Sequence, residues 1–371
     1  MIEEKRMQLQ TVSDTIENCR YCLMCRHVCP VGHVTRKETL TPHGWGLMIA
    51  SVDRGMISWN EETLRVLYSC ADCGTCRSHC VTDQALPDAI AATRAKVATH
   101  EMAPARIKEV HKALQEWGNP YEQISPEKTN GQAKVAVFVG DDAKFLQQET
   151  MDHVIKLIES TGVKPMLIGI GRNNGHLASS LGFPETAKNL IQATLDELRA
   201  SQAKHLLVLS PGDHYVFDRL FKERLDGQWP EDIKLQEVVA YLLEKQGSGE
   251  LKFRPSNDDR PYAYVDPTHS LRVPGRFVAP RRLLSLIMPG DGRELFWRKE
   301  RSHPSGNGAL QFTNPHISDH LAYARLADGR DSGAQLLITE DPGCLHHLDK
   351  FANRFGLKMQ GFYELLADHL S

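Results

Sequence analysis

The sequence lacks the features that would place the protein in a membrane or on nucleic acid. No apolar run approaches the length of a bilayer span; Leu283–Met288 is too short and lies between Arg282 and Pro289. The first residues, Met-Ile-Glu-Glu-Lys-Arg, show neither the hydrophobic region of a secretory signal nor a twin-arginine pair. A formal net charge of −3 gives no overall attraction to polyanions. We therefore expect no transmembrane segment and no nucleic-acid partner.

Cysteine is almost absent outside two short runs, which hold all but one of the nine cysteines. The runs are Cys19-Arg-Tyr-Cys22-Leu-Met-Cys25-Arg-His-Val-Cys29 and Cys70-Ala-Asp-Cys73-Gly-Thr-Cys76-Arg-Ser-His-Cys80. Because a chain of 371 residues buries a core without cross-links, a disulfide framework is a poor explanation. Thiols kept for metal binding indicate a reducing compartment, so we expect a cytoplasmic protein. Peripheral association with the inner membrane through a partner stays open.

Both runs have the spacing C-x2-C-x2-C-x3-C, and Pro30 follows the first. This is the spacing of bacterial-type ferredoxins, in which three close thiolates bind one [4Fe–4S] cube and the fourth cysteine binds the other cube. Soft thiolates suit such clusters, and two-residue spacers let one loop surround three corners. The predicted ligands of the first cluster are Cys19, Cys22, Cys25 and Cys80, and those of the second are Cys70, Cys73, Cys76 and Cys29.

Zinc is the alternative metal for these runs. Zinc sites use C-x2-C pairs, but normally as two separated pairs that supply four ligands to one ion. Two four-cysteine runs with identical internal spacing fit that pattern poorly. A zinc-stabilised interaction protein nevertheless stays open as an alternative to a protein with two [4Fe–4S] clusters.

The chain around the runs has helical periodicity, and no strand pattern interrupts it. A short helix is predicted within residues 1–18, and Asn60 is placed to cap a helix that leads to Cys70. We therefore expect a helical domain over residues 1–105 that holds both clusters. A helical connector follows over residues 106–132.

Two such runs about 40 residues apart in a helical context resemble the α-helical ferredoxin domain. The chain is similar to the C-terminal half of the succinate dehydrogenase iron–sulfur subunit. It resembles more closely the N-terminal module of glycolate oxidase iron–sulfur subunits, of the anaerobic glycerol-3-phosphate dehydrogenase small subunit and of heterodisulfide reductase-like proteins. One departure is that Val81, and not proline, follows Cys80. Since that proline mainly fixes the backbone direction, we expect little consequence.

From residue 133 the pattern changes to α/β. Short β-branched runs that alternate with amphipathic helices predict strands at 134–139, 164–170, 205–209, 262–265 and 335–339. The same order recurs after a Gly-, Ser- and Asp-rich linker, which indicates two similar halves, residues 133–246 and 260–371. The predicted fold class is α+β and multidomain: an α-helical ferredoxin domain followed by an α/β domain of two similar halves.

In the family that the chain resembles, each half is a CCG repeat with cysteines in the turns after its strands. Here the glycines and prolines of that pattern persist, while polar residues replace nearly every thiol. The replacements are Asp141, Asn173-Asn174, Ser210 to Asp213, Thr268 and Ser305 to Asn307, and only Cys344 keeps its thiol. Because hard polar side chains cannot hold an iron–sulfur cube, we expect degenerate, clusterless halves that present a docking surface. A single metal ion on Asp141, Asp213, His269 and Cys344 stays open.

The resemblance implies an electron-transfer subunit, with a flavoprotein (FAD-linked) dehydrogenase as partner and a quinone, an electron-transfer flavoprotein or another carrier downstream. We expect no catalytic residue on this chain. The stretch from Gly169 to Gly175 departs from the G-x-G-x-x-G fingerprint at Asn174, so neither flavin nor nicotinamide is expected. A catalytic subunit like heterodisulfide reductase is the enzyme alternative, and the missing thiols argue against it.

Overall fold

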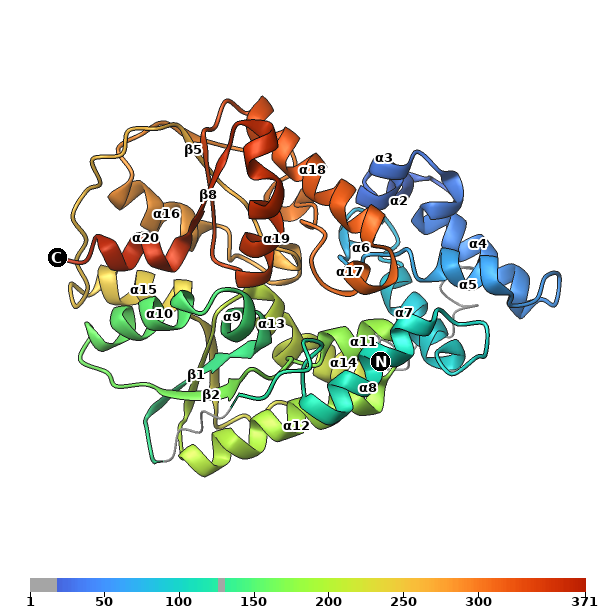
Figure 1. Ribbon diagram of the computed structural model, residues 1–371, viewed down its shortest axis with the longest axis horizontal. Helices are drawn as coiled ribbons and strands as arrows, with labels where there is room; N and C mark the ends of the chain where they lie inside the picture. Colours follow the sequence, from blue (N-terminus) through green and yellow to red (C-terminus); the bar gives the residue numbers. More distant parts are fainter. Residues whose placement is uncertain (1–18, 126–130) are drawn as a thin grey trace.

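The computed structural model describes residues 19–125 and 131–371 (Figure 1). The helix predicted within residues 1–18 lies outside the described residues. The remainder combines helices with two parallel sheets, as the predicted mixed fold class requires. In Figure 1 the N-terminal helices, in blue, lie to one side of the two sheets. None of the described helices is long and apolar enough to cross a membrane.

The N-terminal module is helical throughout its described part, residues 19–125. Its elements are α2 (Met24–His27), α3 (Pro30–Thr35), η2 (Glu38–Leu40), α4 (Pro42–Asp53), α5 (Glu61–Leu67), α6 (Thr75–Ser78), α7 (Leu86–Val97) and α8 (Ala105–Trp117). The predicted cap at Asn60 is confirmed: its side chain accepts a hydrogen bond from the Thr63 amide at 2.9 Å, and the Thr63 hydroxyl accepts one from the Asn60 amide at 2.8 Å. This cap fixes the helix that leads to Cys70.

The first sheet has the strand order β2-β1-β3-β4, and all its pairs are parallel. Its strands are β1 (Val135–Val139), β2 (Met166–Ile170), β3 (His205–Val208) and β4 (Lys234–Glu237). Its helices are α9 (Gly140–Leu146), α10 (Glu149–Glu159), α11 (His176–Leu181), α12 (Pro184–Ser201), α13 (Pro211–Tyr215), a π-helical turn η3 (Val216–Leu220), α14 (Phe221–Leu225) and α15 (Val238–Gly247). Parallel neighbours require such crossover helices.

The second sheet has the equivalent order, β6-β5-β7-β8, and is again parallel. Its strands are β5 (Tyr262–Tyr264), β6 (Gly292–Arg293), β7 (Leu336–Thr339) and β8 (Lys358–Gly361). The helices and turns are η4 (Ser270–Arg272), α16 (Val278–Ile287), η5 (Lys299–Arg301), α17 (Ala309–Thr313), α18 (Pro315–Asp331), α19 (Pro342–Ala352), η6 (Asn353–Phe355) and α20 (Phe362–Asp368). The five strands predicted from sequence coincide with β1, β2, β3, β5 and β7.

One apolar core joins the two sheets. It includes Val137 of β1, Leu157 of α10, Ile338 of β7 and Leu366 of α20, all essentially buried. A further core lies within the helical module and takes in Leu321 of α18. The module is therefore packed against the second sheet's helices, and the carboxyl ends of strands from both sheets face a common space beside it.

Candidate metal centre

The two cysteine runs adopt the same backbone conformation. The third residue of each run is left-handed, with φ of 53° at Tyr21 and 50° at Asp72, and so is the fifth, with 63° at Leu23 and 86° at Gly74. Each run then enters a one-turn helix, α2 or α6. A left-handed conformation is costly for residues other than glycine, so its repetition at matching positions indicates that both runs are shaped to surround the same kind of object.

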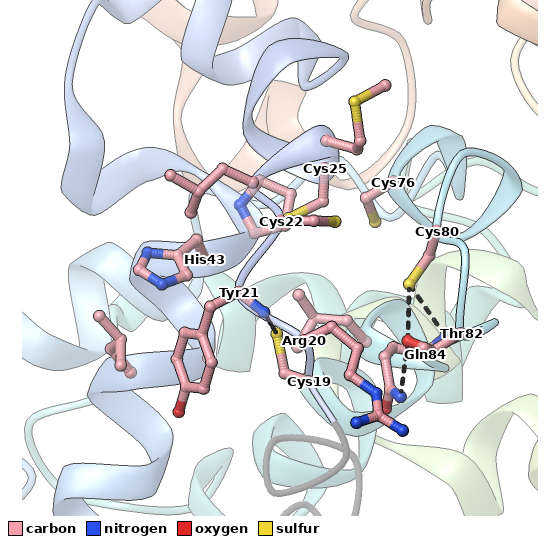
Figure 2. A pocket seen from close by; sticks show the side chains of 16 residues that line it. Cys19, Arg20, Tyr21, Cys22, Cys25, His43, Cys76, Cys80, Thr82 and Gln84 are labelled. Carbon is pink, nitrogen blue, oxygen red and sulfur yellow. Dashed lines mark hydrogen bonds between the residues drawn. The ribbon is translucent and has the colours of Figure 1, made fainter.

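Thiols from both runs gather at an outer site. Cys19, Cys22, Cys25, Cys76 and Cys80 all line a hollow of about 60 Å³ (Figure 2). Cys22 is exposed. Burial, together with the neighbouring thiols of Cys19, Cys80 and Cys22, raises the pKa of Cys25 to about 11. The structure thus brings Cys76 and Cys80, from the second run, beside the first three cysteines, and the assignment of four ligands to each cluster stays a prediction.

The remaining three thiols of the runs lie at an inner site, next to Cys76. Cys29, Cys70 and Cys73 are 3%, 7% and 9% exposed. Burial, with added repulsion from Cys73 and Cys70, raises the pKa of Cys29 well above its usual value. Burial and the thiols of Cys73, Cys70 and Cys29 do the same for Cys76. Thiolates this close together repel one another unless positive charge lies among them, and bound iron ions would supply that charge.

Backbone amides point at sulfur in both sites. The amides of Tyr21, Gly32, Asp72 and Gln84 each lie 3.4 Å from a cysteine Sγ, namely those of Cys19, Cys29, Cys70 and Cys80. Such N–H···S contacts stabilise charge on sulfur and tune cluster potentials. Among the described residues, no three His, Cys, Asp or Glu side chains converge closely enough to hold a single metal ion. Zinc needs that convergence, whereas a cube spreads its four thiolates around four irons.

Comparison with known proteins identifies the module. Residues 15–84 match the family model of the 4Fe-4S dicluster domain. This match supports an iron–sulfur cofactor and an electron-transfer role. The matched segment contains all eight cysteines of the two runs.

The whole fold also has a relative of known structure. A hypothetical protein from Helicobacter pylori, solved by crystallography, superimposes with a TM-score of 0.61 at 11% sequence identity. The similarity covers 88% of this chain and 68% of the other. At that identity the likeness concerns the fold alone. A search of curated proteins gives no match.

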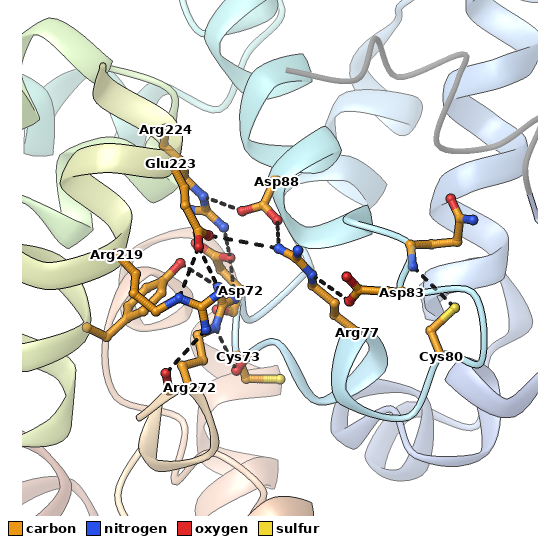
Figure 3. A network of polar contacts seen from close by, with 12 residues as sticks. Asp72, Cys73, Arg77, Cys80, Asp83, Asp88, Arg219, Glu223, Arg224 and Arg272 are labelled. Atoms are coloured by element: carbon orange, nitrogen blue, oxygen red, sulfur yellow. Dashed lines mark hydrogen bonds and ion pairs between the residues drawn. The ribbon is translucent and has the colours of Figure 1, made fainter. Parts of the chain in front are cut away.

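A buried ion-pair network holds the inner cysteine loop to both sheets (Figure 3). Asp72 lies between Cys70 and Cys73, and its carboxylate accepts two hydrogen bonds from Arg224 of α14, at 2.7 and 2.8 Å. Arg272 of η4 donates to the Asp72 carbonyl at 2.9 Å and to its carboxylate at 3.2 Å. Burial acts to raise the pKa of Asp72, but the two arginines more than offset it and hold that pKa well below its usual range. The loop is therefore anchored by charge to each half.

Arg94 supports the inner loop from the opposite side. Its side chain is 1% exposed and donates to the backbone carbonyls of Cys70 at 2.9 Å, Leu67 at 2.8 Å and Ser180 at 2.8 Å. Three carbonyls from α5, the cysteine loop and α11 are thus satisfied by one guanidinium. This residue was not predicted, since an arginine inside an alanine-rich helix gives no sign of burial in the sequence.

Several residues of the turns that the sequence analysis compared with the CCG pattern surround a separate cavity. Asp141, Asp213 and His269 line it, as do Asp142 and Asp341, which the sequence analysis did not single out. Cys344 does not line this cavity and lies in the apolar core under β7, with no exposed surface. These residues therefore form no single-metal site in the described chain.

Proposed function

We propose that this protein passes single electrons between an FAD-linked dehydrogenase and a quinone, an electron-transfer flavoprotein or another carrier, by means of two [4Fe–4S] clusters. The observation that carries the proposal is the gathering of all eight thiols of the two runs at two neighbouring sites, with Cys76 beside thiols of both. The outer cluster would be held by Cys19, Cys22, Cys25 and Cys80, and the inner by Cys70, Cys73, Cys76 and Cys29. When bound, these clusters supply reversible one-electron chemistry.

The chain's own residues then set the environment of each site. The outer site has an exposed thiol and a rim of exposed apolar side chains, among them Tyr21, which is 57% exposed, and Val81, which is 75% exposed. The inner site is buried among helices and fixed through Asp72 to two arginines. Exposed apolar surface next to a cofactor suits contact with another protein. We expect the dehydrogenase to dock at the outer site.

Cluster content and ligand assignment are tested on anaerobically purified protein. Iron and acid-labile sulfide assays should each return about eight per chain, the content of two cubes. Zinc in place of iron would overturn the proposal. Cys29→Ser should disturb the electron paramagnetic resonance signal of the inner cluster, and Cys80→Ser that of the outer one. Cys344→Ser, which removes a buried thiol outside both groups, is the matched control and should change neither signal. Loss confined to the outer cluster in Cys29→Ser would refute the crossover.

The partner is tested by affinity purification of the tagged protein from its own host without oxygen. A flavoprotein that co-elutes in fixed ratio, measured by flavin absorbance, is the expected result. The variant Val81→Lys, which places a charge on the exposed rim, should weaken that association. Lys204→Glu, at an exposed position just before β3 and far along the chain from the cysteine runs, is the control. Recovery of the brown protein without any flavoprotein, under conditions that preserve both clusters, would contradict a stable dehydrogenase complex.

A further inference from the structure

A polar cavity of about 110 Å³ lies where strands of both sheets end beside the inner cysteine loop. Loops after β1, β3, β5 and β7 bring Asp141, Asp213, His269 and Asp341 to its wall, and the segment after α8 adds Tyr121. Carboxyl ends of parallel strands are the usual position of ligand sites in α/β proteins. The cavity is several times larger than the roughly 10–15 Å³ that one water molecule needs.

Four carboxyl groups face this cavity: those of Asp141, Asp142, Asp213 and Asp341. Their hydrogen-bond donors are neutral. Asn173 donates to Asp141 at 2.9 Å, Asn174 donates to Asp213 at 2.8 Å, and the Tyr121 hydroxyl donates to Asp142 at 2.6 Å. No lysine or arginine of the described chain lines the cavity. No side-chain cation of the described chain faces these carboxyl groups, and burial raises the pKa of Asp141 and Asp142, in contrast to Asp72 nearby, which two arginines neutralise.

His269 adds an unsatisfied acceptor that is independent of the carboxyl groups. The residue is 7% exposed and lines the cavity. Its Nε2 lies 3.2 Å from the backbone carbonyl of Asp72, which only accepts, so Nε2 carries the proton and Nδ1 has a bare lone pair. That Nδ1 has no hydrogen-bond partner in the described part of the chain, and it lies beside Gly212, another residue of the cavity wall. A bare lone pair at the cavity wall can accept a hydrogen bond from a donor bound in the cavity.

We propose that this cavity binds a small organic cation that carries a protonated nitrogen. An ammonium group donates up to three hydrogen bonds and accepts none, which matches carboxylates and the bare Nδ1 of His269. A small anion would be repelled by the carboxyl groups. A single metal ion suits the cavity less well, because no three of these side chains converge on one point. The inference does not depend on the proposed electron-transfer function.

The cavity also touches the inner site. Ala71, between Cys70 and Asp72, forms part of its wall. A bound cation would lie next to the loop that carries the inner cysteines. The chain would then contain a site for an organic ligand, whereas the sequence predicts a clusterless docking scaffold in this region, with a single metal ion on Asp141, Asp213, His269 and Cys344 as the alternative.

The protonation of the carboxyl groups gives the proposal a second readout. Burial and the neighbouring Asp142 raise the pKa of Asp341 to about 7, and burial raises that of Asp213 to about 6. Bound positive charge favours the ionised form, so binding should tighten between pH 5.5 and 7.5 and release protons. The titratable groups that face these two carboxyls are Asp141, Asp142, Tyr121, His176, His269 and, behind Asp341, Glu340.

The experiment is isothermal titration calorimetry on the anaerobically purified holoprotein. Methylammonium and ethanolammonium chlorides are the probes, and sodium acetate at equal ionic strength is the anionic control. We expect saturable binding of one cation per chain and none of acetate. Asp213→Asn and Asp341→Asn should each weaken binding about 10- to 100-fold, because each removes a charge-assisted hydrogen bond. Asp152→Asn, at an exposed position of α10, should leave it unchanged.

Proton release is measured on the unaltered protein by repeating the titration in buffers of different ionisation enthalpy. The proton-release measurement needs no substitution, so a variant that fails to fold does not affect it. Failure of both ammonium probes to bind, or binding that neither carboxyl variant weakens, would overturn the proposal. So would cation binding without proton release at pH 6.5. None of these outcomes bears on the iron and sulfide content, which tests the electron-transfer function separately.

Discussion

Gly74→Ala should cost far more stability than an alanine at another left-handed glycine. Gly74 has a φ of +86°, and a Cβ there would lie 2.4 Å from Nε and 2.8 Å from Cζ of Arg272. A guanidinium at the end of a flexible side chain could normally move aside. Here it is fixed, because it donates to the carbonyl of Asp72 at 2.9 Å, to that of Cys73 at 3.3 Å and to the hydroxyl of Tyr215.

The magnitude follows from two separable costs. A left-handed alanine costs about 1–2 kcal/mol at either position. Displacing Arg272 also breaks hydrogen bonds between a buried charge and its acceptors, which adds about 2–3 kcal/mol. Gly55→Ala is the matched control, since Gly55 has a φ of +69° in the same module and nothing within 4 Å of its added Cβ. We therefore expect a loss of about 3–5 kcal/mol for Gly74→Ala and of about 1–2 kcal/mol for the control.

Urea unfolding of the anaerobically purified variants, followed by far-ultraviolet circular dichroism, measures both losses. Equal losses in the two variants would refute the argument that Arg272 is held rigidly against Gly74. The double variant Gly74→Ala/Arg272→Ala supplies a further check. Once Arg272 is truncated, the added methyl group has nothing to displace, so the two losses should sum to more than the loss in the double variant. Strict additivity would contradict the steric reasoning.

Three further predictions concern the charges on either side of the inner loop. Arg224→Met removes the bidentate partner of Asp72 and should lower the free energy of unfolding in urea by about 3–5 kcal/mol. Arg219→Met, at a partly exposed ion pair, is the control and should cost about 1 kcal/mol at most. Similar losses in the two variants would contradict the anchoring role of Arg224. Because the folded-state pKa of Asp72 is depressed, the ionised carboxylate stabilises the fold above about pH 4, and this stabilisation is lost as the pH falls further. The free energy of unfolding should therefore fall steeply below about pH 4 in the unaltered protein and less steeply in Arg224→Met. Asp341 is the opposite case: its pKa is raised from 3.8 to about 7, so its ionisation destabilises the fold as the pH rises through that range. The stability gained by Asp341→Asn should be about 2 kcal/mol larger at pH 8 than at pH 5.5, and a pH-independent gain would contradict it.

Much of the metal centre could be predicted because its determinants are local. The spacing of each cysteine run fixes which thiols share a loop, and the helical pattern around the runs appears as α4, α5 and α7. Central strands were found for the same reason: the Val-Ala-Val-Phe-Val stretch of β1 is buried along its whole length. The edge strand β2 was found because its sequence, Met-Leu-Ile-Gly-Ile, is apolar, whereas β4 and β8 were missed. The sequences of these two strands, Lys-Leu-Gln-Glu and Lys-Met-Gln-Gly, are polar and partly exposed, so no apolar run marks them.

The cavity could not be predicted from local pattern, because its walls come from many distant parts of the chain. Asp141 and Asp213 follow strands of the first sheet, and Asp341 follows a strand of the second. Tyr121 comes from the connector, which the sequence analysis treated as a linker. Each residue by itself has an ordinary local role; Asp341, for example, caps α19 by accepting a hydrogen bond from the Cys344 amide. Only the packing of the two sheets reveals that these carboxyl groups share one space.

The two thiol groups and the cavity lie in a defined order from surface to interior. The outer group includes an exposed cysteine, the inner group is buried, and Ala71 of the inner loop forms part of the cavity wall. A protein partner can therefore approach the outer thiols directly, whereas a small molecule in the cavity meets the inner loop. The same loop is held by Arg224 from one half and Arg272 from the other. A ligand that shifts the two halves relative to each other would therefore act on Asp72, and so on the residues between Cys70 and Cys73.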